Sequence, residues 1–333
     1  MSGGAAEASA QHPFLHGLPE EQRPDGWEED VASVRQWVAT RPHLPPISDD
    51  FLLLFLHSCY MDVARAQSTI ESYFTCKSRW PELFGNRDPL APELQKVLDS
   101  TNMVPLPERT PEGYHVLLYR MVETDPSKLH FVTAMRMFFV FNDAVLSDDG
   151  LAPGYVVVFD MAGVSWGHLA RVSLPAIRKF MIYIQDCHPA RLKGVHVINT
   201  VAFIDRILGL IKPLIKSDLL AMVHFHGPVE SLDRFLPLRL LPEDYGGEAE
   251  SAQTLHDAMR MRLEKEYREW FIAEEKMRVD FSKRPPKNNK ANTKARPPKG
   301  VVPPRPPAPE QGPPALDEQL GATASDFRHL AID

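Results

Sequence analysis

The chain has 333 residues, of which 44% are hydrophobic, and it carries a formal net charge of −7. This length allows one large domain or two smaller ones, and the apolar content is ordinary for a folded protein. The acidic balance disfavours nucleic acid as a partner, and three cysteines are too few for a disulfide framework. The first ten residues lack the pattern of a secretion signal. We therefore expect a cytosolic protein.

The N-terminal third is predicted to be helical after an acidic leader. Residues 1–25 are acidic and rich in small residues, and we expect them to be disordered. Ser48 and Asp62 stand where helix N-caps are expected, each before a run with helical spacing of apolar side chains. Residues 26–105 are therefore predicted to form a small bundle of helices.

The middle of the chain alternates between strand and helix patterns. We predict strands over 115–121, 155–161, 195–200 and 221–226, and helices over 129–146, 174–187 and 202–216. Three of these strands are nearly continuous apolar runs, which is typical of parallel strands covered on both faces. Residues 106–250 are therefore predicted to be an α/β domain with a mixed, largely parallel sheet flanked by helices.

The C-terminal part divides into a helix and a tail. Residues 251–282 have the charge and apolar spacing of one amphipathic helix that packs on the body. Residues 283–333 begin with a basic, proline-rich stretch that cannot form a core, so we expect disorder. Such a tail can be a spacer, hold anionic lipid headgroups at ~1 kcal/mol per charge, or present residues 296–307 to an SH3-like partner.

A strongly apolar helix is expected over residues 201–216. Its charged positions are Asp205, Arg206, Lys212 and Lys216. A helix this apolar is either buried on most sides as core or covers something apolar. A second apolar stretch, 135–146, contains three phenylalanines and Asn142, so the two helices together can wall a cavity with a single polar anchor.

Residues 163–167 form a Gly-x-Ser-x-Gly motif directly after a predicted strand. Such a motif can be the nucleophile elbow of an α/β-hydrolase, with Ser165 as nucleophile. Downstream Asp186 or Asp205, and His224 or His226, occur in the order that a triad requires. No oxyanion-hole segment precedes the serine, so a serine hydrolase is a remote alternative and we expect no enzymatic activity.

Two histidines could suggest a metal site. His224 and His226 lie two positions apart on a predicted strand and therefore share one face. No third ligand is evident near them, so two ordinary strand histidines are favoured over a metal centre. We expect neither a metal nor another cofactor.

Six signatures in family order make the chain resemble the CRAL-TRIO lipid-transfer family, and most of all the branch of alpha-tocopherol transfer protein and cellular retinaldehyde-binding protein. They lie at residues 49–56, 159–163, 188–199, 211–214, 224–227 and 241–247. The resemblance implies a helical N-terminal region before a CRAL-TRIO domain, in which the sheet floors an apolar cavity. It also implies that residues 201–216 are the gate helix of that cavity.

On this resemblance, one set of mostly apolar residues is expected to contact the ligand. The set comprises Phe138, Asn142, Phe159, Val164, Trp166, Phe180, Tyr183, Ile184, Val195, Phe203, Ile207, Ile211 and Ile215. Several of these side chains are bulky enough to fill the cavity themselves, in which case the protein would be a scaffold without a ligand.

The resemblance also implies a basic cleft for phosphoinositides. Its matching positions are Arg191 and Lys193, with Lys216 as a partial substitute for further basic residues. Elsewhere the cleft departs from the family pattern, because non-basic residues occupy its other positions: Cys59, Asp218, Leu220 and Met222. Val201 stands where the family has proline, so the gate geometry is expected to differ.

The sequence thus predicts a non-enzymatic, cytoplasmic carrier that is peripheral on membranes. Its ligand is expected to be a hydrophobic small molecule of the tocopherol, retinoid or phospholipid class, exchanged through the mobile gate. Its other expected partners are the membrane surface, including phosphoinositides, and an SH3-like protein. The alternative is a scaffold or adaptor that keeps the fold without a ligand and recruits partners through the proline-rich tail.

Overall fold

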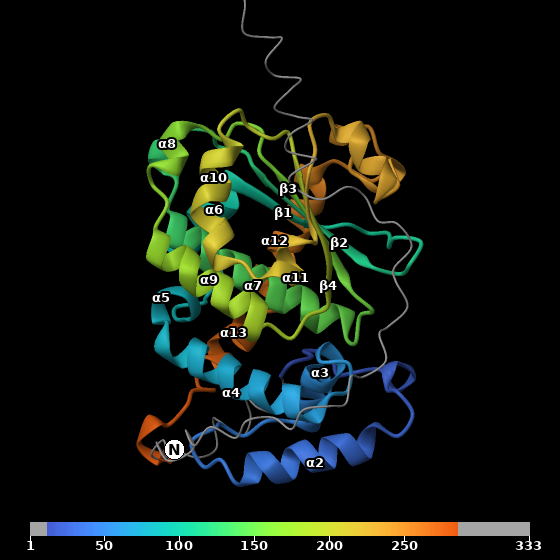
Figure 1. The fold of residues 1–333 in the computed structure, drawn as a ribbon, viewed down its shortest axis with the longest axis vertical. Helices are drawn as coiled ribbons and strands as arrows, with labels where there is room; N and C mark the ends of the chain where they lie inside the picture. Colours follow the sequence, from blue (N-terminus) through green and yellow to red (C-terminus); the bar gives the residue numbers. More distant parts are fainter. Residues whose placement is uncertain (1–11, 286–333) are drawn as a thin grey trace, which may run out of the picture.

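A computed structural model describes residues 12–285 of the chain, which form a helical bundle and an α/β body. Helices α2 to α4 form a bundle at one end, and the α/β body lies above it (Figure 1). The predicted disorder of residues 1–25 is wrong for 12–25, where Phe14 and Leu18 are buried and Glu20–Gln22 form a 3-10 turn. Of the predicted tail 283–333, residues 283–285 are described, and Arg284 pairs with Glu71. The rest of the tail, with its SH3-like segment 296–307, and residues 1–11 lie outside the described residues.

The helices and strands follow one another along the chain with short connections. The helices are α2 Trp27–Ala39, α3 Asp49–Ser58, α4 Val63–Arg79, α5 Pro81–Phe84, α6 Pro92–Ser100, α7 Phe131–Asp149, α8 Trp166–Leu169, α9 Leu174–Asp186, α10 Ile204–Ile211, α11 Ser217–Leu220, α12 Ala252–Lys265 and α13 Arg268–Glu274. The strands are β1 Thr101–Pro105, β2 His115–Met121, β3 Tyr155–Asp160, β4 Leu192–Ile198 and β5 Val223–Phe225.

The five strands form one sheet in the order β1-β2-β3-β4-β5. Strand β1 pairs antiparallel with β2, whereas β2, β3, β4 and β5 run parallel to one another. Parallel neighbours need crossovers, and here α7 and α9 occupy them between successive strands. The predicted mixed α/β fold with a largely parallel sheet is therefore confirmed.

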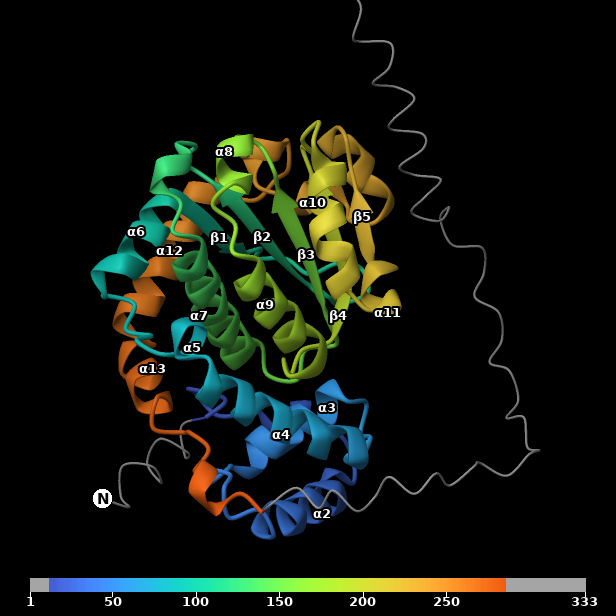
Figure 2. The ribbon, with the colours of Figure 1, turned by 60° about the vertical axis from the view of Figure 1, so that its left-hand side comes forward.

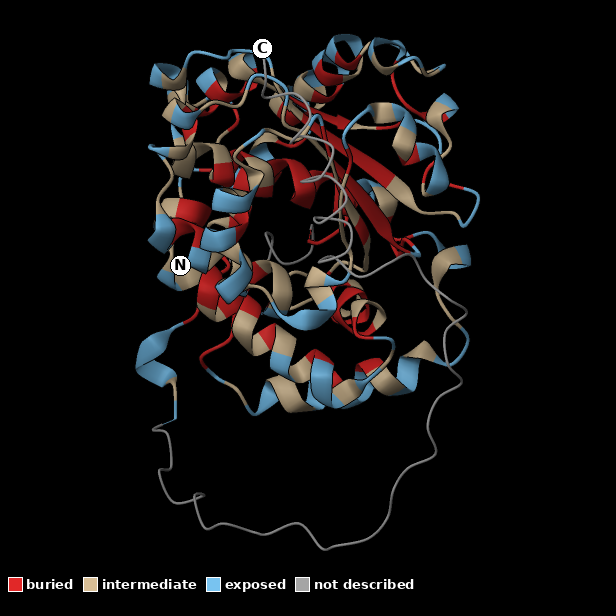
Figure 3. Ribbon diagram, turned by 45° about the horizontal axis from the view of Figure 1, so that its top comes forward, coloured by how far each residue is buried: buried red, intermediate tan, exposed pale blue. Residues whose placement is uncertain are grey.

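Different segments of the chain pack on the two faces of the sheet. Helices α7, α9 and α10 lie on one face (Figure 2). On the other face, alternate strand residues such as Val156 and Val158 pack against Leu232, Leu236 and Leu240 from the segment after β5. The central strands are accordingly largely buried (Figure 3), as expected for parallel strands covered on both sides.

Two predicted helix caps are confirmed in the N-terminal bundle. The Ser48 hydroxyl accepts a hydrogen bond from the Phe51 backbone N–H at 3.3 Å, and α3 begins at Asp49. The Asp62 carboxylate accepts from the Arg65 N–H at 3.0 Å at the start of α4. Each cap satisfies a donor that the first helical turn leaves unpaired.

The first strand, β1, is not among the predicted strands. It is short, contains Asn102 and ends in Pro105, and both residue types are depleted in strands. Its position explains why these residues are tolerated, because an edge strand does not need every N–H for pairing. Helix α12 covers β1, and His256 bonds with the backbone of Met103.

The prediction of one continuous helix over 251–282 is wrong. The structure has α12, a break, and then α13, which ends at Glu274. At the break Tyr267 is fully buried, and its hydroxyl is hydrogen-bonded to Asp148. Burial of this ring turns the chain inward, and spacing along the sequence alone does not indicate such a turn.

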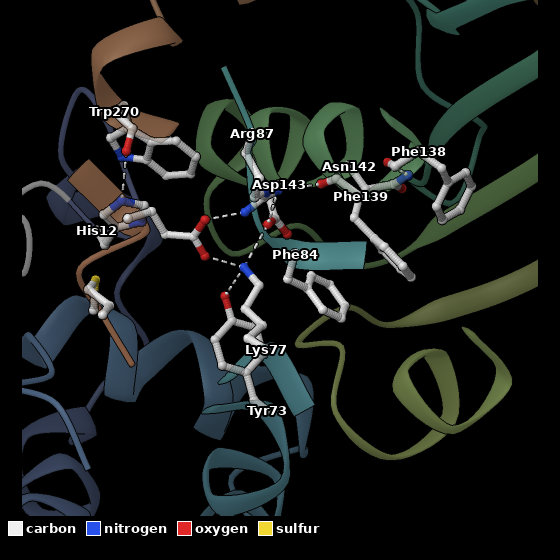
Figure 4. Close-up of polar contacts among 12 residues, drawn as sticks. His12, Tyr73, Lys77, Phe84, Arg87, Phe138, Phe139, Asn142, Asp143 and Trp270 are labelled. Carbon is white, nitrogen blue, oxygen red and sulfur yellow. Dashed lines mark hydrogen bonds and ion pairs between the residues drawn. The ribbon is translucent and has the colours of Figure 1, made fainter. Parts of the chain in front are cut away.

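A cluster of four buried charges joins the bundle, the body and the C-terminal helices (Figure 4). Lys77 of α4 donates to Asp143 of α7 at 2.8 Å and to Tyr73 at 2.8 Å, and it also pairs with Glu274 of α13. Arg87 pairs with the same two carboxylates, at 2.7 Å from Asp143. The two cations thus face two carboxylates, so the charges of the cluster cancel. Without this pairing, burying these charges would be costly.

Candidate functional site: an apolar cavity on one face of the sheet

A cavity of about 330 Å³ lies between the sheet and helices α7, α9, α10 and α11. Its walls are almost entirely apolar. They comprise Leu117, Phe138, Asn142, Val145, Leu146, Tyr155, Val157, Phe159, Met161, Phe180, Met181, Ile184, His188, Ala190, Leu192, Val195, Val197, Ile204, Ile207, Leu208, Ile211, Ile215, Leu219, Leu220, Val223 and Phe225. This size is at the lower end of the ~300–1,000 Å³ typical of small-molecule sites.

The floor of the cavity follows from the alternation of side chains along the strands. Val157 and Phe159 of β3 point to the cavity side, and Val195 and Val197 of β4 do the same. The residues between them face the opposite side, because successive strand residues alternate between faces. Strand pairs Val157↔Val195 and Phe159↔Val197 bring these side chains into register.

Helix α10 covers the cavity with one face. Ile204, Ile207 and Ile211 line the cavity at the three- and four-residue spacing that places them on one side of a helix. Asp205 and Arg206 are exposed on the other side. The α-helix is shorter than predicted, since it ends at Ile211 and a 3-10 turn over Lys212–Leu214 follows. Pro213 in this turn lacks the N–H that a continuing helix would need.

Three side chains with polar atoms, Asn142, Tyr155 and His188, belong to the otherwise apolar lining. Asn142 is held in place, because its amide donates to the Phe138 carbonyl at 2.7 Å and accepts from the Tyr119 hydroxyl at 3.1 Å. His188 is different: its buried Nδ1 has no hydrogen-bond partner among residues 12–285. Burial lowers the pKa of His188 to about 4, so the ring is neutral at pH 7 and can donate or accept one hydrogen bond.

Most of the residues expected to contact a ligand lie together in this wall. Nine of them line the cavity: Phe138, Asn142, Phe159, Phe180, Ile184, Val195, Ile207, Ile211 and Ile215. The aromatic members do not fill it, because Phe138 and Phe159 pack against Tyr119, at 5.0 and 5.1 Å between ring centroids, with Phe138 tilted and Phe159 stacked. The structure therefore has an open cavity, whereas a scaffold without a ligand would fill this space with its own side chains.

Four of the expected residues do not line the cavity. Tyr183 is fully buried against the rings of Phe84 and Phe139, on the side of α9 that faces the N-terminal helices. Phe180 and Ile184, four residues apart, share the cavity face, and Tyr183 lies about 100° around the helix from Ile184. Tyr183 therefore does not line the cavity, contrary to expectation.

The other three expected residues that do not line the cavity are Val164, Trp166 and Phe203, near α8 and the start of α10. Val164 sits in the turn after β3, where its N–H bonds to the Met161 carbonyl at 3.0 Å. Trp166 is 59% exposed and stacks on Phe203, the residue before α10, at 4.4 Å between ring centroids. The rings of Trp166 and Phe203 meet outside the cavity, because the turn after β3 leads the chain away from the sheet before α8 begins.

The three basic residues expected to bind headgroups fall into two groups. The Arg191 guanidinium lies 4.3 Å from the centroid of the Tyr60 ring, and Lys193 donates to the Tyr60 hydroxyl at 3.1 Å. Lys216 instead pairs with Asp186 at the edge of a second pocket of about 530 Å³. We call this second space, between α4 and α9, the polar pocket.

The polar pocket has a different lining from the apolar cavity. It is lined by Ser58, Cys59, Arg65, Ser68, Thr69, Glu71, Ser72, Thr75, Cys76, Ile182, Ile184, Gln185, Asp186, Cys187, His188, Ala190, Lys216 and Arg284. Ile184, His188 and Ala190 belong to both linings, so these three residues separate the two spaces.

The Gly-x-Ser-x-Gly motif forms a helix cap. Ser165 and His168 form a capping box at the start of α8, in which the Ser165 N–H donates to His168 Nδ1 at 3.0 Å. The hydroxyl of Ser165 lies 2.9 Å from the same nitrogen. His226, one of the histidines considered for a triad, bonds with His196 at 3.0 Å and with Ser231 at 3.1 Å instead. The motif is accounted for by local structure.

Three histidines lie together: His196 of β4, His224 of β5 and His226, which directly follows β5. His196 joins His224 and His226 on the sheet face opposite the cavity, where their rings also contact Phe235. Within residues 12–285, no group of three or more His, Cys, Asp or Glu side chains is arranged to hold a metal ion.

Several lining residues were not predicted. Val157 and Val197 could have been found, because each lies two positions from a residue that was predicted and therefore shares its face. The sequence indicated His188 as a lining residue only weakly, because a histidine just before a strand can have many roles. Met161, Met181 and Leu219 carry no pattern that distinguishes them from ordinary core residues.

Comparisons with known proteins place these features in a family. A model of the CRAL/TRIO domain matches residues 99–247, and a model of the Pinta-like UBA domain matches residues 23–94. The mouse (Mus musculus) protein "Alpha-tocopherol transfer protein-like" is 32% identical over 238 residues, covering 70% of this chain and 69% of that protein. Clavesin-1 of Xenopus laevis is 25% identical over 230 residues, covering 68% and 69%.

A solved structure, "Crystal structure of Sfh5", aligns with 76% of this chain and 86% of its own, at a TM-score of 0.45 and 13% identity. Within residues 12–285, the helices are all too short or too polar to cross a membrane. The match to the CRAL/TRIO model covers the sheet and the cavity helices, and the mouse relative extends the match across most of the chain. The chain therefore belongs to the CRAL/TRIO family.

Proposed function

We propose that this protein carries a hydrophobic small molecule in its apolar cavity and exchanges it at membranes. The observation that carries the proposal is the cavity of about 330 Å³, whose lining from four helices and the sheet is almost entirely apolar. Small-molecule sites have this character, with a few polar groups that fix orientation. Its relatives include a protein named as alpha-tocopherol transfer protein-like, which supports a lipid ligand. The class that we propose is tocopherol, retinoid or phospholipid.

The energetics of such a ligand require a route that avoids water. A ligand with ~20 buried CH₂-equivalents gains ~16 kcal/mol relative to water, at ~0.8 kcal/mol per group. Release into the cytosol would be extremely slow at that cost. We therefore propose that helix α10 is a gate that moves into a membrane interface, so that the ligand passes directly into the bilayer.

The position of α10 supports this role. Ile207 and Ile211 cover the cavity, while Asp205 and Arg206 face solvent, so the helix separates an apolar space from water. Leu210 is 36% exposed and offers apolar surface on the outside of the same helix. An amphipathic helix with these features can lie in a membrane interface.

We propose that His188 orients the ligand. Its Nδ1 is unpartnered, as is the Tyr155 hydroxyl, whereas Asn142 is already hydrogen-bonded to Phe138 and Tyr119. Leaving a buried polar atom unpaired costs ~1–3 kcal/mol, which a ligand hydroxyl or carbonyl would recover. The ligand class that fits is a long apolar molecule with one hydrogen-bonding group.

We propose that the protein works in the cytoplasm and meets membranes through basic side chains. Arg191 and Lys193 lie together at Tyr60 and can contact acidic headgroups, phosphoinositides among them. Lys216 joins them only if it leaves Asp186. Any contribution of the basic tail adds to these contacts.

The experiment is transfer of a fluorescent tocopherol analogue between vesicles of zwitterionic phospholipid. Ile211→Asp places a charge on the cavity face of α10 and is expected to abolish transfer. Arg206→Asp changes the charge on the exposed face of the same helix and is expected to transfer normally. Unchanged transfer by Ile211→Asp would contradict the gate, and native mass spectrometry of the protein from its own cells would identify the natural ligand.

A further inference from the structure

All three cysteines of the chain lie at the polar pocket. Cys59, Cys76 and Cys187 are free and buried, yet each contributes to the lining of this space of about 530 Å³. Buried cysteines usually act as small apolar side chains. Cysteines that line a polar pocket are in addition within reach of small polar reagents.

Two of the three sulfur atoms are in contact. The Cys187 thiol donates to the Sγ of Cys76, with 3.5 Å between the two sulfur atoms, although the residues are 111 positions apart in the chain. Cys76 belongs to α4, and Cys187 directly follows the last residue of α9. Cys59 has a different environment, because its Sγ faces the hydroxyls of Ser58 and Thr69 at 3.8 and 3.6 Å.

The surroundings give the two contacting thiols different acidities. The hydrogen bond from Cys187 lowers the pKa of the Cys76 thiol and outweighs the opposing effect of burial, with a further contribution from Arg79. The same hydrogen bond, together with burial, raises the pKa of Cys187. Cys76 is therefore the sulfur that more readily becomes a thiolate, which is the form that reacts with oxidants.

We propose that Cys76 and Cys187 form a reversible thiol–disulfide site that reacts with hydrogen peroxide. The Cys76 thiolate attacks one peroxide oxygen, which breaks the O–O bond, forms a sulfenic acid and releases hydroxide. The Cys187 sulfur then attacks the Cys76 sulfur and displaces its hydroxyl, which leaves as water with the Cys187 proton. In sum, two thiols lose two electrons and two protons, and one peroxide becomes two waters.

The disulfide would tie two parts of the fold together. It would join α4 of the N-terminal bundle to the end of α9, whose Phe180, Met181 and Ile184 line the apolar cavity. A covalent bond at the end of this wall restrains its movement. Resting on the proposed carrier function, the consequence is slower exchange of ligand in the oxidised protein.

Cys59 is the internal control for the chemical test, because its sulfur contacts the hydroxyls of Ser58 and Thr69. The full chain and the variants Cys59→Ser, Cys76→Ser and Cys187→Ser are treated with hydrogen peroxide, and thiols are then counted in denaturant. The full chain should lose two of its three thiols and yield a linked peptide pair containing Cys76 and Cys187, which dithiothreitol reverses. Cys59→Ser should form the same linkage, and the other two variants should not.

Two results would overturn the proposal: a linkage that involves Cys59, or loss of thiols in the full chain without the Cys76–Cys187 linkage. The functional consequence is measured separately, as transfer of the fluorescent tocopherol analogue before oxidation, after it, and after reduction. Slower transfer that reduction restores supports the restraint of α9, and equal rates refute it. Because the linkage is detected without ligand, failure of the carrier function leaves the chemical test intact.

Discussion

The indole ring of Trp166 stacks on the phenyl ring of Phe203, with 4.4 Å between the ring centroids and 26° between the ring planes. Trp166 begins α8, and Phe203 immediately precedes α10. The stack therefore joins the loop after β3 to the start of the proposed gate. Because Trp166 is 59% exposed, it can be removed without leaving a hole in the core.

The first prediction concerns this stack. Trp166→Ala should speed hydrogen exchange at the start of α10 by up to about tenfold, because an aromatic pair contributes ~0.5–1.5 kcal/mol beyond its buried area. Val122→Ala is the control, since Val122 is 48% exposed and lies away from α10, just after β2. Hydrogen exchange with mass spectrometry measures both, and equal exchange in the two variants would show that the stack does not hold the gate.

The second prediction concerns His188 as the polar anchor. His188→Phe keeps an aromatic ring but removes the unpartnered Nδ1, so the affinity for a long-chain alcohol should fall about tenfold, equivalent to ~1.4 kcal/mol. The affinity for the alkane of the same length should stay the same. Competition against a fluorescent hydrophobic probe measures both affinities.

Ile184→Val provides the control for that comparison. Ile184 also belongs to the wall between the cavity and the polar pocket, but it carries no polar atom. It should alter the alcohol and alkane affinities in parallel. If His188→Phe also affects the two ligands equally, the histidine only shapes the cavity.

The third prediction concerns the buried charge cluster. Glu274→Gln leaves Lys77 and Arg87 with Asp143 as their remaining carboxylate, and breaking a buried ion pair costs ~3–5 kcal/mol. The free energy of unfolding should fall by about that amount in urea denaturation. Glu269→Gln is the control on the same helix, because that side chain is 82% exposed and surface changes lie within ~0.5 kcal/mol. Equal effects of the two changes would mean that the cluster does not stabilise the fold.

The fourth prediction concerns pH. Burial lowers the pKa of His196 to about 3 and of His226 to about 4, from an ordinary value of 6.5. A base with a lowered pKa in the folded state takes up a proton on unfolding, so its contribution is present above pH 6.5 and is lost as pH falls. Between pH 7 and pH 5, each such histidine should remove about 1–2 kcal/mol from the free energy of unfolding.

His226→Gln should therefore show a smaller loss of stability between pH 7 and pH 5 than the unchanged protein. His16→Gln, at an exposed histidine, should lose as much as the unchanged protein. The comparison uses the difference between the two pH values, so it holds even if His226→Gln is less stable at pH 7. An unchanged pH dependence in His226→Gln would rule out the histidine as its source.

Local patterns in the sequence determined much of the fold. Ser48 and Asp62 cap α3 and α4 as predicted, because capping depends on residues within one helical turn. The apolar runs predicted β2 and β3 closely, and their parallel pairing follows from strands alternating with helices. The apolar composition of residues 201–216 likewise indicated a helix that is core or covers something apolar, although α10 spans only Ile204–Ile211.

Tertiary structure decided which side chains meet. Phe180 and Tyr183 are equally plausible cavity residues by type, but the way α9 packs turns only Phe180 to the cavity. Lys77 reaches Glu274 across 197 positions, and Cys76 reaches Cys187 across 111. Spacing along a helix or strand fixes only which residues share a face. The partner of that face depends on the packing of distant segments, which no local pattern encodes.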